Sequence, residues 1–325
     1  MKLARREFLR LAGYGPVFPF VSRMTRAQAY PAGPVRLVVG FPAGGPVDLA
    51  ARVIGPWLSE RLGQAFEVEN LAGESGNFAT RTVVQAPPDG QTLLLCGPVN
   101  TINSTLFPNL DFDFARDIAP VASISRVPLI VEVHPAVAAR TLPEFLAFAQ
   151  AHPGQLKVAY AGRGTPQHIG IELFKMMAGI DLTLVPYLGS VPALADLLTG
   201  RVHVMFDPMP SSIDHIRSGR LIPLAVTSPS RSEALPDVPA ISDFIPGYEA
   251  GSWFGIGAPR NTPLSVINRI NSEVNAGLRD SKIKARLAEL GATAIPGSHT
   301  DFGRFIATET ERFAKVIRTL KITAG

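Results

Sequence analysis

The first decisive stretch of this sequence is Val35-Arg36-Leu37-Val38-Val39-Gly40-Phe41-Pro42-Ala43-Gly44-Gly45-Pro46-Val47-Asp48. Its opening run, Val35–Gly40, is short and apolar, which is typical of a strand buried on both faces of a parallel sheet. A loop rich in glycine and proline follows, and the amphipathic segment Leu49–Leu62 then predicts a helix. Strand, glycine loop and helix in this order form one half of a βαβ unit.

The same order returns later in the chain. Lys157–Ala161 predicts a strand, Gly162-Arg163-Gly164-Thr165-Pro166 a loop, and Gln167–Ala178 a helix. Apolar runs and turn signals predict further strands at Phe66–Glu69, Thr92–Cys96, Leu182–Pro186, Val202–Phe206 and Ile222–Thr227, with helical segments at Arg81–Gln85 and Val191–Leu198. Strands that alternate with helices indicate an α/β protein with parallel sheets.

Two extended segments are suited to crossing between domains. Val121–Val133 is a long apolar stretch, and Gly251–Gly255 offers a return path. We therefore expect one discontinuous domain of residues 30–127 and 247–325, and a second domain of residues 128–246, each with a central, mostly parallel sheet.

The end of the chain predicts three helices. Thr262 is expected to cap the first, with Pro263 at its first helical position. Ser281 is expected to cap the second, which Gly291 ends, and the third is expected over Thr300–Leu320.

Residues 1–29 read as a leader peptide. A basic start with Lys2 and Arg10 precedes an apolar region at Leu11–Val21 and a small-residue cleavage site at Ala27-Gln28-Ala29. The run Arg5-Arg6-Glu7-Phe8-Leu9-Arg10 resembles the twin-arginine export motif. We expect export, and a periplasmic mature protein cleaved after about Ala29.

Removing this leader changes the charge balance. It holds six of the 31 basic and one of the 27 acidic side chains, which leaves 25 basic against 26 acidic residues, or about −1. Nucleic-acid binding needs clustered Lys and Arg, so it loses its support. No later apolar run approaches the roughly 20 residues of a membrane span.

Glycine loops that lead into helices can bind anions without a charged side chain. The N–H groups of the first helical turn and the helix dipole both favour a carboxylate. In open parallel sheets such loops lie at the carboxyl ends of the strands. Two of them, one in each domain, predict a cleft that closes on a small carboxylate.

The sequence resembles the Bug family, the periplasmic receptors of tripartite tricarboxylate transporters, over nearly the whole mature chain. The residues that carry the resemblance are Tyr30-Pro31, Phe41-Pro42-Ala43-Gly44-Gly45, Asp48, Ala51-Arg52, Val68-Glu69-Asn70, Gly73, Gly76, Pro88–Leu94, Gly162, Gly164, His168, Glu172-Leu173-Phe174, Val185-Pro186-Tyr187, Leu224–Thr227, Leu235–Pro239 and Trp253-Phe254-Gly255. The resemblance implies a type II periplasmic-binding-protein fold, of the Venus-flytrap kind, whose two loops hold a ligand carboxylate largely through backbone donors and waters.

The resemblance and the loop argument together give the candidate ligand-binding residues. They are Phe41, Ala43, Gly44, Gly45, Val47 and Asp48 in the first loop, and Gly162, Arg163, Gly164, Thr165, His168, Tyr187 and Asp207 in the second domain. A structural role as a helix-start carboxylate is favoured for Asp48 over ligand contact. For His168 a structural hydrogen bond is at least as plausible as ligand contact. Asp207 fits a contact to a ligand amino group or cation and a loop-capping role equally well.

Two positions depart from the family pattern. Pro46 stands where a small residue is common and has no N–H to donate, so one backbone contact is missing unless Pro46 is the first helical residue. Arg163 has the geometry to pair with a second carboxylate, although a solvated arginine is the commoner case.

Other functions have less support. The lone Cys96 is expected to be a buried apolar residue, and there is no spacing of His and Cys that predicts a metal site. Neither nucleotide-binding glycine motifs nor a nucleophile elbow occur in a suitable context. We expect no cofactor and no catalysis, and a monomeric receptor for a transporter. A sensor that docks on a signalling partner is the alternative, and an enzyme is the less favoured one.

Overall fold

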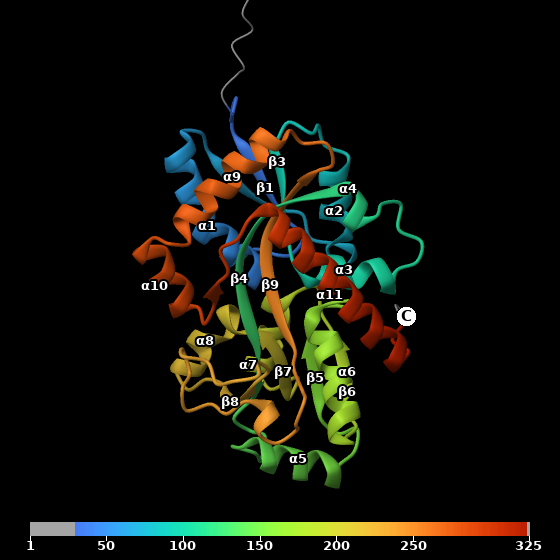
Figure 1. The fold of residues 1–325 in the computed structure, drawn as a ribbon. Coiled ribbons are helices and arrows are strands. Elements are labelled where there is room, and N and C mark those ends of the chain that lie inside the picture. Colours follow the sequence, from blue (N-terminus) through green and yellow to red (C-terminus); the bar gives the residue numbers. More distant parts are fainter. Residues whose placement is uncertain (1–29, 324–325) are drawn as a thin grey trace, which may run out of the picture.

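The computed structural model describes residues 30–323 and has an α/β fold (Figure 1). The predicted leader, its twin-arginine motif and its cleavage site lie outside the described residues. The strands are β1 (Val35–Val39), β2 (Phe66–Asn70), β3 (Thr92–Cys96), β4 (Ile118–Val133), β5 (Lys157–Tyr160), β6 (Thr183–Pro186), β7 (Val204–Pro208), β8 (Ile222–Val226), β9 (Gly251–Pro259) and β10 (Thr293–Ala294). The helices are α1 (Pro46–Leu62), α2 (Asn77–Val84), α3 (Pro98–Leu106), α4 (Phe114–Asp117), α5 (Leu142–Ala151), α6 (Pro166–Ala178), α7 (Ser190–Leu198), α8 (Met209–Arg217), α9 (Leu264–Gly277), α10 (Ser281–Glu289) and α11 (His299–Leu320), with 3₁₀ turns at Glu74–Gly76 and Ile241–Asp243.

One path of hydrogen-bonded strands runs through the molecule in the order β2-β1-β3-β9-β4-β7-β5-β6, and β8 and β10 pair with β4 beside it. The strands β2, β1 and β3 are parallel at one end, and β7, β5 and β6 are parallel at the other. Both antiparallel strands in the middle, β9 and β4, join these two groups. We call the part around β1–β3 the first half and the part around β5–β8 the second half.

The long strand β4 connects the two halves, as the apolar segment Val121–Val133 predicted. Its residues from Ile118 to Pro128 pair with β9, and those from Leu129 to Val133 pair with β7. Pairing therefore changes at Pro128 and Leu129, next to the expected boundary between residues 127 and 128. The division of the chain into domains stays a prediction.

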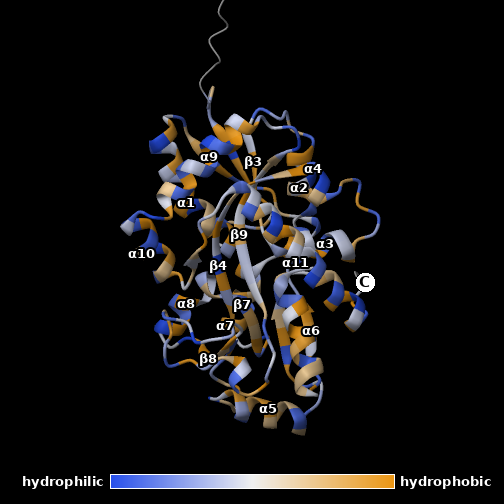
Figure 2. Ribbon diagram, in the orientation of Figure 1, coloured by the Kyte–Doolittle hydropathy of each residue, from blue (hydrophilic) through white to orange (hydrophobic). Residues whose placement is uncertain are grey.

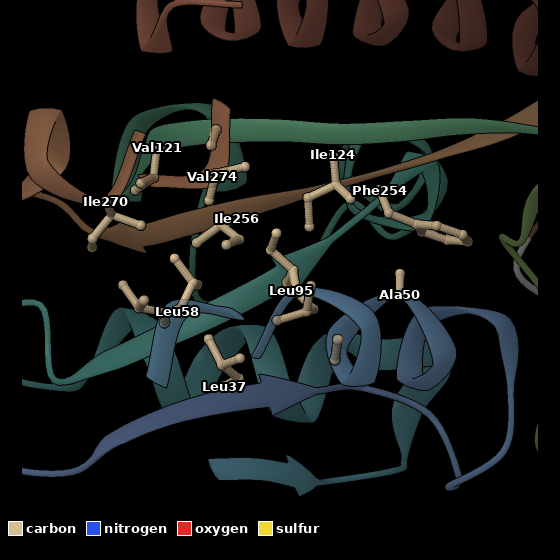
Figure 3. Close-up of a cluster of buried hydrophobic side chains, with 14 of the residues drawn as sticks. Leu37, Ala50, Leu58, Leu95, Val121, Ile124, Phe254, Ile256, Ile270 and Val274 are labelled. Atoms are coloured by element: carbon tan, nitrogen blue, oxygen red, sulfur yellow. The ribbon is translucent and has the colours of Figure 1, made fainter. Parts of the chain in front are cut away.

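Each half has its own hydrophobic core. In the first half, Leu37 and Leu95 from the strands meet helix residues such as Leu58 and Ile270, and Figure 3 shows these side chains pointing toward one another. A second large cluster, around Phe145, Phe174 and Phe206, fills the second half. Figure 2 shows that helices such as α6 and α9 carry both hydrophobic and hydrophilic residues. Each fully buried side chain of this size stabilises the fold by about 1.5–3 kcal/mol.

Two helix starts differ from the expectations. The helix α9 begins at Leu264 with Pro263 as its N-cap, and the Thr262 hydroxyl donates instead to the Pro259 carbonyl. The helix α10 is capped by Asp280, whose carboxylate accepts from the N–H groups of Lys282 and Ile283. The expected caps, Thr262 and Ser281, are wrong by one position, since an aspartate or a proline just outside the helix takes the role.

The last helix, α11, packs against both halves. Its side chains Phe313 and Ile317 form one cluster with Ile102 and Leu106 of α3 and with Ile169 of α6. Figure 1 shows α11 lying along the right side of the molecule, between α3 and α6. Among residues 30–323, no helix is long and apolar enough to cross a membrane.

Candidate ligand-binding site

A cavity lies between the two halves, at the ends of the strands where the helices begin. Its lining residues are Phe41, Pro42, Gly45, Pro46, Val47, Gly97, Pro98, Val99, Ala161, Thr165, Pro166, Gln167, Ser190, Val191, Pro208, Ser252 and Phe254. The first residues of α1, α3, α6 and α7 are all in this set, and Pro208 directly precedes α8. Five helix N-termini therefore converge on one cavity, which we call the inner cavity.

The inner cavity is lined by uncharged residues. Within the part of the chain that the structure describes, no Lys, Arg, Asp, Glu or His side chain lines it. Five prolines and two phenylalanines are among its lining residues, and Thr165, Gln167, Ser190 and Ser252 supply the side-chain polar groups. A negative charge placed there would be stabilised by helix dipoles and N–H groups, because those of a first helical turn have no acceptor within the helix.

The first predicted loop is held in place by Asp48, in the first turn of α1. The Asp48 carboxylate accepts hydrogen bonds from the Gly44 N–H at 2.8 Å, from Arg52 Nε at 2.7 Å and from Asn70 Nδ2 at 3.0 Å. Burial raises the pKa of Asp48, but these hydrogen bonds outweigh it and leave the pKa below its usual value. Asp48 is only 1% exposed, and it does not line the inner cavity. Asp48 therefore has a structural role, which is to hold the first loop. Its carboxylate accepts the hydrogen bond of the Gly44 N–H, which we expected to face the ligand.

Pro46 is the first residue of α1, with Gly45 as the N-cap. The missing N–H of a proline costs little at this position, because its fixed φ angle suits the start of a helix. Donors for a ligand are therefore the next N–H groups of α1, those of Val47 and Asp48. The departure at Pro46 changes the wall of the cavity without removing these donors.

The second predicted loop is held by its own side chains. Thr165 caps α6 by accepting from the His168 N–H at 3.4 Å, and its hydroxyl donates to the Gly162 carbonyl at 2.7 Å. The ring of His168 stacks on Tyr160, with 5.0 Å between centroids, and Nδ1 of His168 accepts from the Gly164 N–H. Burial, together with the nearby Arg163, lowers the pKa of His168 to about 4. A neutral ring is required for this acceptor role, so His168 shapes the loop.

A small space, which we call the neck, shares Phe41 and Ala161 with the inner cavity, and it shares Ser75 and Tyr187 with a wider basin that is open to solvent. The neck is lined by residues that include Phe41, Ser75, Ala161 and Tyr187. The basin, which we call the outer basin, is lined by Glu74, Ser75, Asn77, Arg81, Phe107, Asn109, Leu110, Gly162, Arg163, Pro186, Tyr187, Leu188 and Pro192. Arg163 is exposed there, away from the inner cavity.

Asp207 lies behind the inner cavity. It is fully buried at the end of β7 and is held by serine hydroxyls, among them Ser190 Oγ at 2.5 Å. No cation contacts it among residues 30–323, and it does not line the cavity. The position agrees with a capping role at helix starts more closely than with direct contact to a ligand cation.

The predicted residues thus separate into three groups. Phe41, Gly45, Val47 and Thr165 line the inner cavity, while Gly162, Arg163 and Tyr187 line the outer basin. Ala43, Gly44, Asp48, Gly164, His168 and Asp207 lie beside these spaces without lining them. That any of them contacts a ligand stays a prediction.

Several lining residues were not anticipated. The start of α3 at Pro98, the start of α7 at Ser190 and the residues Gln167, Pro208 and Ser252 all face the cavity. A signal for one of them was present, because the strand Thr92–Cys96 is followed by Gly97-Pro98, the same strand, glycine and proline order as the first loop. The sequence between Leu198 and Ser218 held no comparable pattern for α8.

Comparisons with known proteins identify the family of this chain. The model of the tripartite tricarboxylate transporter family receptor matches residues 50–322. The protein BugT of Bordetella pertussis is 34% identical over 296 residues, which cover 90% of this chain and 90% of that protein.

Two solved structures, each covering most of both chains, extend the likeness to the fold. An R. palustris protein with adipate is 38% identical, with a TM-score of 0.88 over 90% of this chain and 99% of the other. MatC from Rhodopseudomonas palustris with bound malate is 31% identical, with a TM-score of 0.84 over 89% of this chain and 100% of the other. The two-domain α/β fold expected from the sequence is thereby confirmed. The chain belongs to the tripartite tricarboxylate transporter receptor family, the family of the Bug proteins.

Proposed function

We propose that this protein is a periplasmic receptor that captures a small carboxylate in the inner cavity and delivers it to the membrane components of a tripartite tricarboxylate transporter. The observation that carries the proposal is the convergence of helix starts from both halves on a cavity lined by uncharged residues. Such a site attracts an anion through dipoles and N–H groups. The structures of relatives with adipate and malate support a carboxylate as the ligand.

The arrangement favours binding over catalysis. Among the lining residues in the described part of the chain no hydroxyl contacts a histidine ring, and the acid that Ser190 contacts, Asp207, is fully buried behind the cavity wall. The proposed cycle is hinge closure: the ligand bridges the two halves, water leaves the cavity, and the closed form docks on its membrane partner.

The outer basin sets the size of ligand that the site accepts. In this proposal the inner cavity holds one carboxylate, with the apolar body of a monocarboxylate against proline and phenylalanine rings. A second carboxylate would have to extend through the neck toward Arg163 and Arg81. We therefore propose monocarboxylates with apolar bodies and extended dicarboxylates as the ligand classes to test first.

A thermal-shift screen of the mature protein tests the proposal. Mono-, di- and tricarboxylates, amino acids and aromatic acids are compared, and a ligand at about 100 times its Kd should add about 2.7 kcal/mol to the free energy of unfolding. Adipate against adipamide is the matched pair, because the two have nearly the same size and shape and the amide has no negative charge. The proposal is wrong if no carboxylate raises the melting temperature while a sugar or a nucleotide does.

A further inference from the structure

Two fully buried carboxyl groups lie behind the inner cavity on neighbouring strands. Asp207 is on β7 and Glu132 is on β4, and both side chains are 0% exposed. The hydroxyl of Ser212 lies between them, 2.6 Å from Glu132 Oε1 and 3.2 Å from Asp207 Oδ2. A hydroxyl has a single proton and can donate to only one of the two. The other contact requires a proton on a carboxyl group.

Of the two carboxyl groups, Glu132 is the one that is protonated. Burial and the charge of Asp207 raise the pKa of Glu132 well above its usual value. A protonated Glu132 can donate to Ser212, which in turn donates to Asp207. The cluster then holds a single negative charge, on Asp207.

Within residues 30–323, the carboxylate of Asp207 forms hydrogen bonds only with neutral side chains, which lie at the starts of three helices. They are Gln167 in the first turn of α6, Ser190 in α7, and Ser211 and Ser212 in α8. The elements packed against this end of β7 carry, besides Glu132, the titratable or charged residues Arg126, Lys157, Tyr160, His168, Glu172, Lys175, Asp196, Asp214, His215 and Arg217. Within residues 30–323 none of these ten forms a hydrogen bond or ion pair with Asp207. The negative charge of Asp207 has no cation to balance it.

Only the side chains of Ser190 and Gln167 separate this charge from a ligand that would bind in the inner cavity. Ser190 and Gln167 line the inner cavity and also contact Asp207. A carboxylate in the cavity would place a second negative charge next to that of Asp207 in a poorly solvated site. Two like charges at such separation cannot both remain ionised without a large cost, and protonation of one of them removes it.

From this arrangement we infer that binding of a carboxylate in the inner cavity is coupled to the uptake of one proton from solvent by Asp207. The inference rests on the proposed function. While Asp207 is ionised, the only proton of the Ser190 hydroxyl points to it. Once Asp207 is protonated, it donates to a serine oxygen, and the Ser190 hydroxyl turns its proton toward the ligand carboxylate. Asp207 is a positioning residue, because its protonation redirects the proton of the Ser190 hydroxyl from Asp207 to the ligand.

The coupling has a defined pH dependence. Burial, only partly offset by the hydrogen bonds from Ser190, Ser211, Ser212 and Gln167, raises the pKa of Asp207 to about 6. At pH 7 the unliganded protein therefore has Asp207 mostly ionised, and the ligand's charge raises this pKa further. As the pH rises from about 6 to the pKa of Asp207 in the complex, Kd should increase by up to about tenfold per pH unit. Below about pH 6, Kd should no longer change with pH.

Calorimetric titration at pH 7.5 in buffers of different ionisation heat measures the proton directly. The probes are adipate, malate and benzoate, added to the mature protein. We expect uptake of up to one proton per molecule bound, according to how far the ligand raises the pKa of Asp207. In Asp207→Asn the uptake should disappear and Kd should become independent of pH, because an amide has no proton to gain. In Glu132→Gln the uptake should persist.

The outcomes separate this inference from the proposed function. Saturable binding to the wild-type protein with heats that do not depend on the buffer overturns the inference and leaves carboxylate capture standing. Uptake that persists in Asp207→Asn but is lost in Glu132→Gln also overturns it. If none of the three carboxylates binds between pH 5.5 and pH 8, the proposed function fails with it. Circular dichroism checks that each variant is folded, and the wild-type titration alone decides the question if a variant is not.

Discussion

At the scale of single residues, several positions that the glycine-loop pattern selected serve the scaffold. The Asp48 carboxylate accepts a hydrogen bond from the Gly44 N–H, and the His168 ring accepts one from the Gly164 N–H. Two of the N–H groups that we expected to bind the ligand therefore donate to side chains of their own loops. Both side chains are at least nine-tenths buried. Their identity matters because each holds a loop in the shape that lets the next helix start reach the cavity.

Gly164 is the residue where this packing is tightest. Its φ of +72° is a left-handed conformation, and an added Cβ would meet Asn103 Oδ1 and lie 3.0 Å from Leu106 Cδ2 of α3, in the other half. We predict that Gly164→Ala costs about 2–4 kcal/mol of unfolding free energy, from backbone strain and overpacking together, and weakens adipate binding. Urea denaturation and calorimetric titration measure the two effects.

Gly179 offers a matched control for this substitution. It has a similar φ of +64°, but an added Cβ there would have no neighbour within 4 Å. Gly179→Ala should cost only the strain, about 1–2 kcal/mol, and leave adipate affinity unchanged. Equal effects of the two substitutions on affinity would show that the close packing of Gly164 against α3 does not influence adipate binding.

At the scale of elements, helix starts determine the character of the site. The helices α1, α3 and α6 each have proline in the first turn, so proline rings form part of the cavity wall while the N–H groups of the following residues remain as donors. The orientation of α1 depends on its connection to β1 and β2, which Asp48 secures through Gly44 and Asn70. Loop and helix therefore act as one unit.

This unit can be tested by removing its central acceptor. Asp48→Ala removes the acceptor of the Gly44 N–H and one of the two acceptors of Asn70 Nδ2, which also donates to the Phe41 carbonyl. We predict a loss of about 2–4 kcal/mol in the free energy of unfolding at pH 7. Arg52→Ala removes the salt-bridge partner, which is 52% exposed, and should cost less than about 1 kcal/mol. Chemical denaturation compares them; a similar cost for both would mean that the ion pair, and not the loop hydrogen bonds, holds the unit.

At the scale of the whole molecule, the two halves are joined by more than the long strands. The helix α11 lies across α3 and α6, whose first residues both line the inner cavity. Phe313 is central to this contact and is 4% exposed. Packing at α11 should therefore influence how the two halves meet around a ligand.

We predict that Phe313→Ala lowers the free energy of unfolding by about 3–5 kcal/mol and also weakens adipate binding by about threefold or more. The control is Phe302→Ala on the same helix, since Phe302 is 1% exposed and packs within the first half, against Trp253. It should cost a similar free energy of unfolding with little change in affinity. Parallel calorimetric titrations of adipate compare the two variants, and affinity losses of the same size would show that α11 stabilises the fold without influencing the site.

The sequence by itself determined the α/β class, the two strand, glycine loop and helix units, the crossing strand β4 and the family. These features are encoded locally, in apolar runs, glycine and proline positions and helix periodicity, so neighbouring residues suffice to find them. Cys96, expected to be buried, is 0% exposed.

Tertiary structure alone decided which groups face the ligand space. Ser190, Gln167 and Ser252 lie far apart in the chain and meet only because strands from both halves end at one place. The proximity of Glu132 and Asp207 is likewise non-local, because the two residues lie on neighbouring antiparallel strands with the Ser212 hydroxyl between their side chains. Their burial shifts their proton affinities, and burial depends on the whole fold, so no local pattern could reveal it.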